Sequence, residues 1–374
     1  MSKFFVNTVW LLVFCFVTIS VNAQDTQIST ALSFLRISAD ARAAGLGDQG
    51  VATTPDVFSQ QWNSSKYVFA EREGGIALNV TPYLSRIVDD VILGNIVAYK
   101  KLKDGRSAVA ASFRYFSLGD VEFRNSADDL PIIQEPNQLV FDVSYSLKLS
   151  ENFSMSVAGR YLRSDLRLST VGGSDASAGN SFGVDITGYY QSRDLRVGAI
   201  DGRWRAGFAI TNIGPKLEFS DNQESFIPTN LALGGGFDFD IDAFNKIRTS
   251  IEVNKLLVPS PQADGSDQDQ SAIGSIFSSF GDAEGGFSEE LQEFTISVGA
   301  EYVYDDVFAL RAGYFSEDED KGARQFVSLG AGFKYSSIGI DLSYLFSTSD
   351  VVSPLEGTLR FGLTFAFGDE VRNF

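Results

Sequence analysis

Residues 138–149 read QLVFDVSYSLKL, and apolar side chains alternate along this stretch with polar ones. Leu139, Phe141 and Val143 occupy every second position, and Asp142 and Ser144 lie between them. Side chains of a β-strand point alternately to opposite faces, so this strand has one apolar face and one polar face. Residues 359–367, LRFGLTFAF, show the same alternation at the other end of the chain.

From Gly74 onward the chain repeats this unit about fourteen times, with a turn after each segment of roughly ten residues. The pattern predicts strands at residues 74–81, 90–101, 106–118, 138–149, 152–165, 180–191, 203–213, 229–241, 246–257, 292–304, 307–316, 325–336, 338–347 and 357–367. An even number of alternating strands is typical of a transmembrane β-barrel, with lipid outside and a polar lumen. We therefore predict an all-β fold, an antiparallel barrel over residues 74–374.

The chain begins with a segment that has the features of a secretory leader. An apolar run from Phe4 to Ile19 follows Lys3 and precedes Val21-Asn22-Ala23, a small-x-small cleavage site. We predict that residues 1–23 are removed and that the mature chain, which begins at Gln24, resides in the outer membrane. No later apolar run approaches the ~20 residues that a membrane helix requires.

Several kinds of chemistry are excluded by composition. The chain has no histidine, and its one cysteine lies in the leader, so His-based hydrolysis and thiolate metal sites cannot be built. The net charge of −18 disfavours nucleic acid as a partner. Residues 264–269, DGSDQD, have the spacing of calcium ligands but lack the completing Glu of an EF-hand, so a solvated acidic loop is favoured. We expect no enzyme activity, no metal and no cofactor.

The connections between the predicted strands alternate in length. Those at 103–105, 150–151, 242–245, 305–306 and 336–337 are tight, whereas those at 119–137, 166–179, 214–228, 258–291 and 317–324 are long. Tight turns of such barrels lie in the periplasm and long loops lie outside the cell. This parity predicts that both termini are periplasmic.

The positions that face inward carry charges of both signs. They are Arg114, Asp142, Arg160, Arg205, Glu252, Glu301 and Asp341. Such a set suits a salt-bridge network that holds the barrel together, or a selectivity path through an open lumen. Outside the lumen, Trp62, Trp204 and tyrosines near strand ends, among them Tyr99, are interpreted as aromatic girdles.

Residues 24–73 differ in character from the strands. The stretch Ala31 to Ala44 is rich in Ala, Leu and Arg and ends at Gly45-Leu46-Gly47, which predicts a short helix with a glycine stop. We expect this segment to plug the lumen at its periplasmic mouth.

The longest outer loop contains an apolar stripe at near-helical spacing, made of Ile273, Ile276, Phe277, Phe280, Phe287 and Leu291. Three interpretations remain open. The stripe caps its own barrel mouth, docks onto a protein partner, or captures a lipophilic ligand.

The stretch FLRISADARAAGLGD at residues 34–48, followed by QWNSS at residues 61–65, resembles the opening of the PorV/PorQ family of Bacteroidota, within the wider FadL-like class. Within this family, the sequence of residues 34–48 is most similar to that of PorV. The resemblance implies a fourteen-stranded barrel with an N-terminal hatch, to which it assigns Leu35, Arg36, Arg42, Gly45, Leu46, Gly47 and Asn63. Ser64-Ser65 replace the Pro-Ala that commonly follows this Asn, which argues against transport of fatty acids.

The resemblance also implies a role in type IX secretion. Proteins of this kind bind the C-terminal signal domain of exported cargo and carry it from the giant translocon barrel to the surface attachment complex. The stripe Ile273, Ile276, Phe277, Phe280 and Phe287 is the candidate surface for cargo or partner. The alternatives are a FadL-like transporter of hydrophobic small molecules and a purely structural partner of another barrel.

Overall fold

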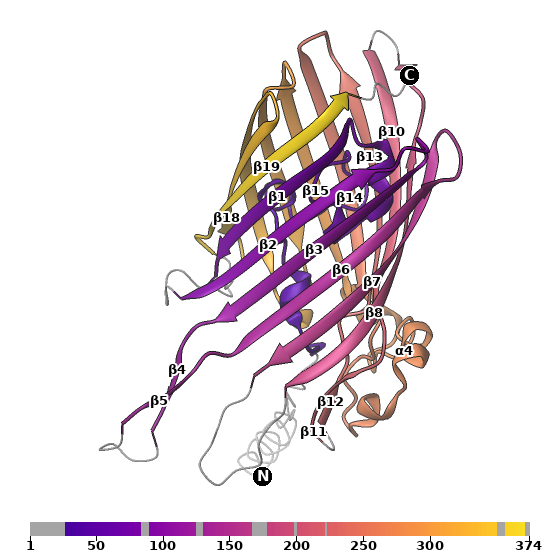
Figure 1. Cartoon of the computed structure of the whole chain (residues 1–374). Coiled ribbons are helices and arrows are strands. Elements are labelled where there is room, and N and C mark those ends of the chain that lie inside the picture. Colours follow the sequence, from indigo (N-terminus) through magenta and orange to yellow (C-terminus); the bar gives the residue numbers. More distant parts are fainter. Residues whose placement is uncertain are drawn as a thin grey trace, which may run out of the picture.

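The computed structural model describes residues 27–83, 90–124, 130–166, 178–197, 200–220, 223–349 and 356–370. The predicted leader, residues 1–23, lies outside these residues. Fourteen of the described strands close into one antiparallel barrel (Figure 1). In ring order they are β1 (Arg72–Pro82), β2 (Val91–Lys101), β3 (Ser107–Leu118), β6 (Asn137–Lys148), β7 (Phe153–Asp165), β8 (Gly179–Gln191), β10 (Ile200–Ile213), β13 (Asn230–Asp240), β14 (Asn245–Leu256), β15 (Phe294–Tyr304), β16 (Phe308–Ser316), β17 (Gln325–Tyr335), β18 (Ile338–Ser347) and β19 (Leu359–Glu370).

Each strand pairs with the next along the chain, and β19 pairs with β1 to close the ring. The bounds agree with the alternation pattern to within a few residues. The alternation also predicts the faces: Phe141 and Val143 are about half exposed on the outer face, whereas Asp142 and Ser144 are buried in the lumen. Closure leaves no unpaired barrel edge, which a lipid environment requires.

The tight connections gather at one end of the barrel, here named the turn end, and the long ones gather at the other, the loop end (Figure 1). Turn chemistry explains the tight connections. Asp305 and Asp306 both have positive φ, as a two-residue hairpin turn requires, and the Asp242 carboxylate accepts the N–H groups of Phe244 and Asn245.

The loop end carries small additional elements. They are the ribbons β4 (Val121–Phe123) with β5 (Ile132–Gln134) and β11 (Leu217–Ser220) with β12 (Gln223–Ser225), and the helices η3 (Ser266–Asp269), α4 (Ala272–Ser278), α5 (Phe287–Gln292) and η4 (Glu319–Lys321). Strand β9 (Leu195–Val197) pairs antiparallel with the first residues of β10 at the turn end. None of the helices within the described residues combines the length and the apolar character that a membrane crossing would take.

Residues 27–71 fill the lumen along its height and are named the plug (Figure 1, indigo). It contains η1 (Ser33–Arg36), α2 (Ala41–Ala44), α3 (Ser59–Trp62) and η2 (Ser64–Phe69). Helix α2 packs against β17, β18 and β19, and η2 packs against β2, β3, β6, β7 and β8.

The single helix expected over residues 31–44 is wrong, because two separate turns form instead. The Asp40 backbone is extended, and its carboxylate accepts the N–H of Ala43, which starts a new helix at Ala41. Between the turns, the N–H of Ala39 donates to the side chain of Gln61 rather than to a helical carbonyl.

The expected position of this segment at the mouth with the tight turns is also wrong. Phe34 stacks on Phe116 near the loop end, and the N–H of Ala31 donates to the carbonyl of Phe226 in the β10–β13 loop. Strand β19 ends at the turn end. The first and last described residues therefore lie at opposite ends of the barrel, not at one end as expected.

Candidate functional site

The charged residues expected in the lumen do lie there, and within the described residues all of them except Glu252 form ion pairs. The Glu301 carboxylate lies 2.9 Å from Arg42 of the plug, 2.7 Å from Arg311 of β16 and 3.1 Å from Arg248 of β14. Arg311 also contacts Asp341, at 2.6 Å. This cluster joins the plug to three neighbouring strands and a fourth, β18.

A second cluster crosses β3, β6, β7 and β8. Arg160 lies 2.6 Å from Asp185 and 3.7 Å from Asp142, and Arg114 lies 3.5 Å from the Asp142 carboxylate. The plug joins this cluster as well, since the side-chain amide of Gln60 donates to Asp142 at 2.6 Å.

Arg205 and Glu252 hold the plug by its backbone. Arg205 contacts Asp238 at 2.9 Å and donates to the carbonyl of Ala52. Glu252 accepts the N–H groups of Gly50 and Val51, both at 2.8 Å. Buried charged groups are tolerated when ion pairs or hydrogen bonds replace their hydration. Arg205 has its ion pair with Asp238, and Glu252 accepts hydrogen bonds from Gly50, Val51 and Asn254.

The glycines of the Gly-Leu-Gly step lie where the plug touches the barrel wall backbone to backbone. A Cβ on Gly45 would lie 3.0 Å from the Cα of Gly330, and one on Gly313 would lie 2.1 Å from the nitrogen of Gly47. Gly47 has φ +84°, and the preceding residue, Leu46, is buried. The step therefore fits a close approach that larger residues would block.

The remaining hatch residues are fixed to the wall. The Asn63 amide donates to the carbonyls of Val51 and Gly188, both at 2.9 Å. Arg36 forms a 2.7 Å ion pair with Glu317 at the loop end, and Leu35 packs against the apolar cluster around Phe34.

The turn end of the lumen is closed by an aromatic cluster. Tyr67 of the plug stacks on Tyr99 of β2 at 4.6 Å, and Phe69 lies 5.7 Å from Tyr189 of β8. The girdle interpretation is thus wrong for Tyr99, which faces inward, and for Trp62, whose indole N–H donates to Asp40 within the plug. The aromatic cluster was missed because alternation predicts which residues face inward but not which of them meet.

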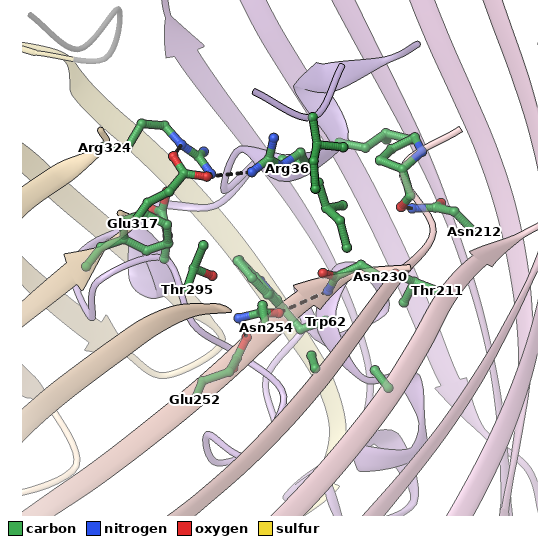
Figure 2. A pocket seen from close by; sticks show the side chains of 18 of the residues that line it. Arg36, Trp62, Thr211, Asn212, Asn230, Glu252, Asn254, Thr295, Glu317 and Arg324 are labelled. Carbon is green, nitrogen blue, oxygen red and sulfur yellow. Dashed lines mark hydrogen bonds and ion pairs between the residues drawn. The ribbon is translucent and has the colours of Figure 1, made fainter. Parts of the chain in front are cut away.

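The part of the lumen towards the loop end holds a cavity of about 110 Å³ between the plug and β10, β13, β14 and β15 (Figure 2). A row of amides lines one side: Asn230 donates to Asn254 at 3.0 Å, and Asn254 donates to Glu252 at 3.2 Å. Arg36, Arg324 and Glu317 form the opposite side, and Trp62 lies between.

Glu317 is held charged by two arginines. Burial alone would raise the pKa of its carboxyl, but Arg324 at 2.6 Å and Arg36 at 2.7 Å outweigh burial and lower the pKa below its ordinary value. This ion triplet connects the plug to the β16–β17 loop.

The loop between β14 and β15, residues 257–293, is named the aromatic loop. Many of its large apolar side chains are exposed, and several of its polar side chains are buried. Phe277 and Phe287 are each 78% exposed, and Ile273, Phe280 and Leu291 are more than half exposed. Ile276 is only partly exposed. The predicted residues therefore gather in one loop with most of their apolar side chains facing solvent, not folded over the barrel's own mouth.

Polar side chains of the aromatic loop point inward instead. Ser275, Ser279, Glu290 and Glu293 are buried. Lys255 at the end of β14 contacts Glu290 at 3.1 Å and Glu293 at 2.6 Å. These ion pairs hold the polar side of the loop against the barrel, and the aromatic side chains of the loop therefore face outward.

A family model described as "Type IX secretion system protein PorV" matches residues 20–263, more than half of the chain. The chain belongs to the PorV family. Among curated proteins, none matches this sequence.

Solved structures show the fold to which this PorV-family barrel is similar. The toluene transporter TodX of Pseudomonas putida superposes with a TM-score of 0.50 at 11% identity, covering 91% of this chain and 98% of TodX. A TodX mutant described as a monoaromatic hydrocarbon channel gives a TM-score of 0.52 at 11% identity, covering 89% and 99%. A FadL homologue of Pseudomonas aeruginosa gives 0.47 at 11% identity, covering 92% and 100%. The PorV-family chain is thus an outer-membrane β-barrel with a FadL-like fold.

Proposed function

We propose that this barrel binds the C-terminal signal domain of type IX cargo and carries it from the translocon barrel to the surface attachment complex, without catalytic activity. The family supports the secretion system as the setting. The aromatic loop supports the binding step, because it offers an exposed apolar surface on a backbone that ion pairs already hold in place.

The energetic argument rests on the exposed aromatic side chains. Apolar side chains that stay exposed to water gain no stabilisation from burial. On soluble proteins, a large contiguous patch of such side chains commonly marks an interaction site. Aromatic anchors on a preorganised loop lose little conformational entropy when a partner covers them. The aromatic loop meets both conditions.

Transport of hydrophobic small molecules, for which the TodX structures are named, is less well supported. The Arg42–Glu301 ion pair joins the plug to β15, and further ion pairs extend this cluster to β14, β16 and β18. Arg205 of β10 donates to the carbonyl of Ala52 in the plug, and Tyr67 and Phe69 close the turn end. A transporter would have to displace this segment, which buries charged side chains that need their partners.

The experiment replaces Phe277 and Phe287 with Ser and measures binding of a purified C-terminal signal domain to the purified barrel in detergent. Each lost anchor costs about 1 to 3 kcal/mol, so the dissociation constant should rise about 30-fold or more. The matched control is L130S/I133S, which removes exposed apolar groups from another loop at the same end. Unchanged binding by F277S/F287S, with cargo display on cells also unchanged, would refute the proposal.

The proposal also requires the loop end to face the cell exterior. An epitope inserted beside the exposed Gly265 should be labelled by antibody on intact cells. Labelling only after the outer membrane is permeabilised would place the aromatic loop on the wrong side for surface cargo.

A further inference from the structure

A groove of about 440 Å³ lies on the outer surface of the barrel beside the aromatic loop. Its apolar lining comes from Leu291 of α5 and from Phe294 and Ile296 of β15, and Leu291 and Ile296 are about half exposed. Its acidic lining comes from Asp318, Glu319 and Asp320, in and beside η4. The groove therefore places carboxylates directly beside exposed apolar side chains.

The charge around this groove is one-sided. Residues 257–293 contain eight acidic residues and no Lys or Arg. The two cations that follow this acidic lining in the sequence are ion-paired within the fold: Lys321 contacts Glu289 at 2.5 Å and Glu293 at 3.2 Å, and Arg324 contacts Glu317. Glu319 is exposed and makes no ion pair with any residue that the structure describes.

We infer that this groove receives a segment of the protein partner that carries apolar side chains next to Lys or Arg. The inference rests on the proposed function and specifies the chemistry of the partner. Apolar contact with Leu291, Phe294 and Ile296 supplies affinity, and the acidic side selects a basic partner and speeds its approach.

Charge also argues against a lipid occupant. Lipid headgroups at a bacterial surface carry phosphates, and the carboxylates of Asp318, Glu319 and Asp320 repel them. A basic protein segment gains from the same carboxylates. The electrostatic contribution acts between exposed groups, so it must weaken as salt rises.

The experiment measures binding of a purified C-terminal signal domain to the barrel at low and high NaCl, for wild type and for E319K/D320K. Wild type should bind more weakly as salt rises. The charge-reversed variant should bind about 3- to 30-fold more weakly at low salt, with a smaller salt dependence. E122K/E135K changes the net charge equally on the β4–β5 side of the loop end and should bind as wild type does.

The outcomes separate this inference from the proposed function. If F277S/F287S loses binding but E319K/D320K and salt have no effect, the basic partner is refuted and cargo binding stands. If neither variant loses binding, the proposed function fails as well. Heat-modifiable migration of each variant checks that the barrel is folded. Binding of lipopolysaccharide vesicles in Mg²⁺ that competes with cargo and is abolished by E319K/D320K would overturn the protein occupant in favour of a lipid surface.

Discussion

Replacing Glu301 should loosen the plug without dismantling the barrel. Glu301 is buried, and its carboxylate contacts Arg42, Arg311 and Arg248 at 2.9, 2.7 and 3.1 Å. In an E301A protein Arg42 keeps Asp56 and Arg311 keeps Asp341, but Arg248 has no other ion pair within the described residues. Breaking a buried ion pair costs about 3 to 5 kcal/mol. Because Arg42 and Arg311 each keep one partner, we expect the cost of E301A to lie near the lower end of this range.

The barrel wall should survive because its backbone ladder does not depend on Glu301. The cost should therefore appear as more frequent release of the plug. A loss of about 3 kcal/mol corresponds to a roughly 100-fold larger open population.

The assay uses a cysteine as a reporter of plug release. Ser38 is fully buried in the plug, and the only natural cysteine lies in the predicted leader. In a S38C background, the maleimide labelling rate should rise about 100-fold when E301A is added. The control is D306N, which removes an exposed ion pair with Lys246 at 2.8 Å and should change the rate less than about fivefold. Equal labelling rates with and without E301A would show that the Glu301 cluster does not hold the plug.

Three further predictions concern the same segment. Deleting residues 31–46 removes α2 and its wall contacts, so the barrel should either fail to fold or show higher single-channel conductance in planar bilayers; a folded, closed barrel would mean that η2 alone seals the lumen. G313L should prevent docking of Gly47 and raise labelling of S38C, whereas G159A, with open space around its Cβ, should not; equal effects would reject the backbone contact. The lowered pKa of Glu317 means that its stabilisation is complete above the ordinary Glu pKa of about 4.3 and is lost as pH falls through the folded-state value. Protease sensitivity of the N-terminal segment should therefore rise in wild type as pH falls below the ordinary Glu pKa, and E317Q should be sensitive already at pH 7; equal resistance of E317Q and wild type at pH 7 would contradict this.

The strands were predictable from the sequence because their signal is local. In a strand that separates lipid from a polar lumen, apolar and polar side chains must alternate. Each strand segment of the sequence shows this alternation, as at Leu139 to Ser144. The same alternation predicted that Arg160, Glu252 and Glu301 face inward, since facing depends only on the position within a strand.

The contacts of these inward residues depend on the tertiary structure. Arg42 and Glu301 are 259 positions apart, and nothing in either neighbourhood indicates the other. The break of the expected helix at Asp40 has the same origin, because burial against Asn79, Gln61 and Trp62 overrides the helical preference of an Ala-rich segment.

The sequence by itself thus determined the barrel, its strand parity and the presence of an apolar stripe in residues 273–291, since each is a periodic pattern within a short window. Only the tertiary structure decided that the plug runs to the loop end and that the stripe is exposed. Lys255 and Lys321, from two different parts of the chain, draw Glu290 and Glu293 inward, and the aromatic side chains of the same loop are left facing outward as a result.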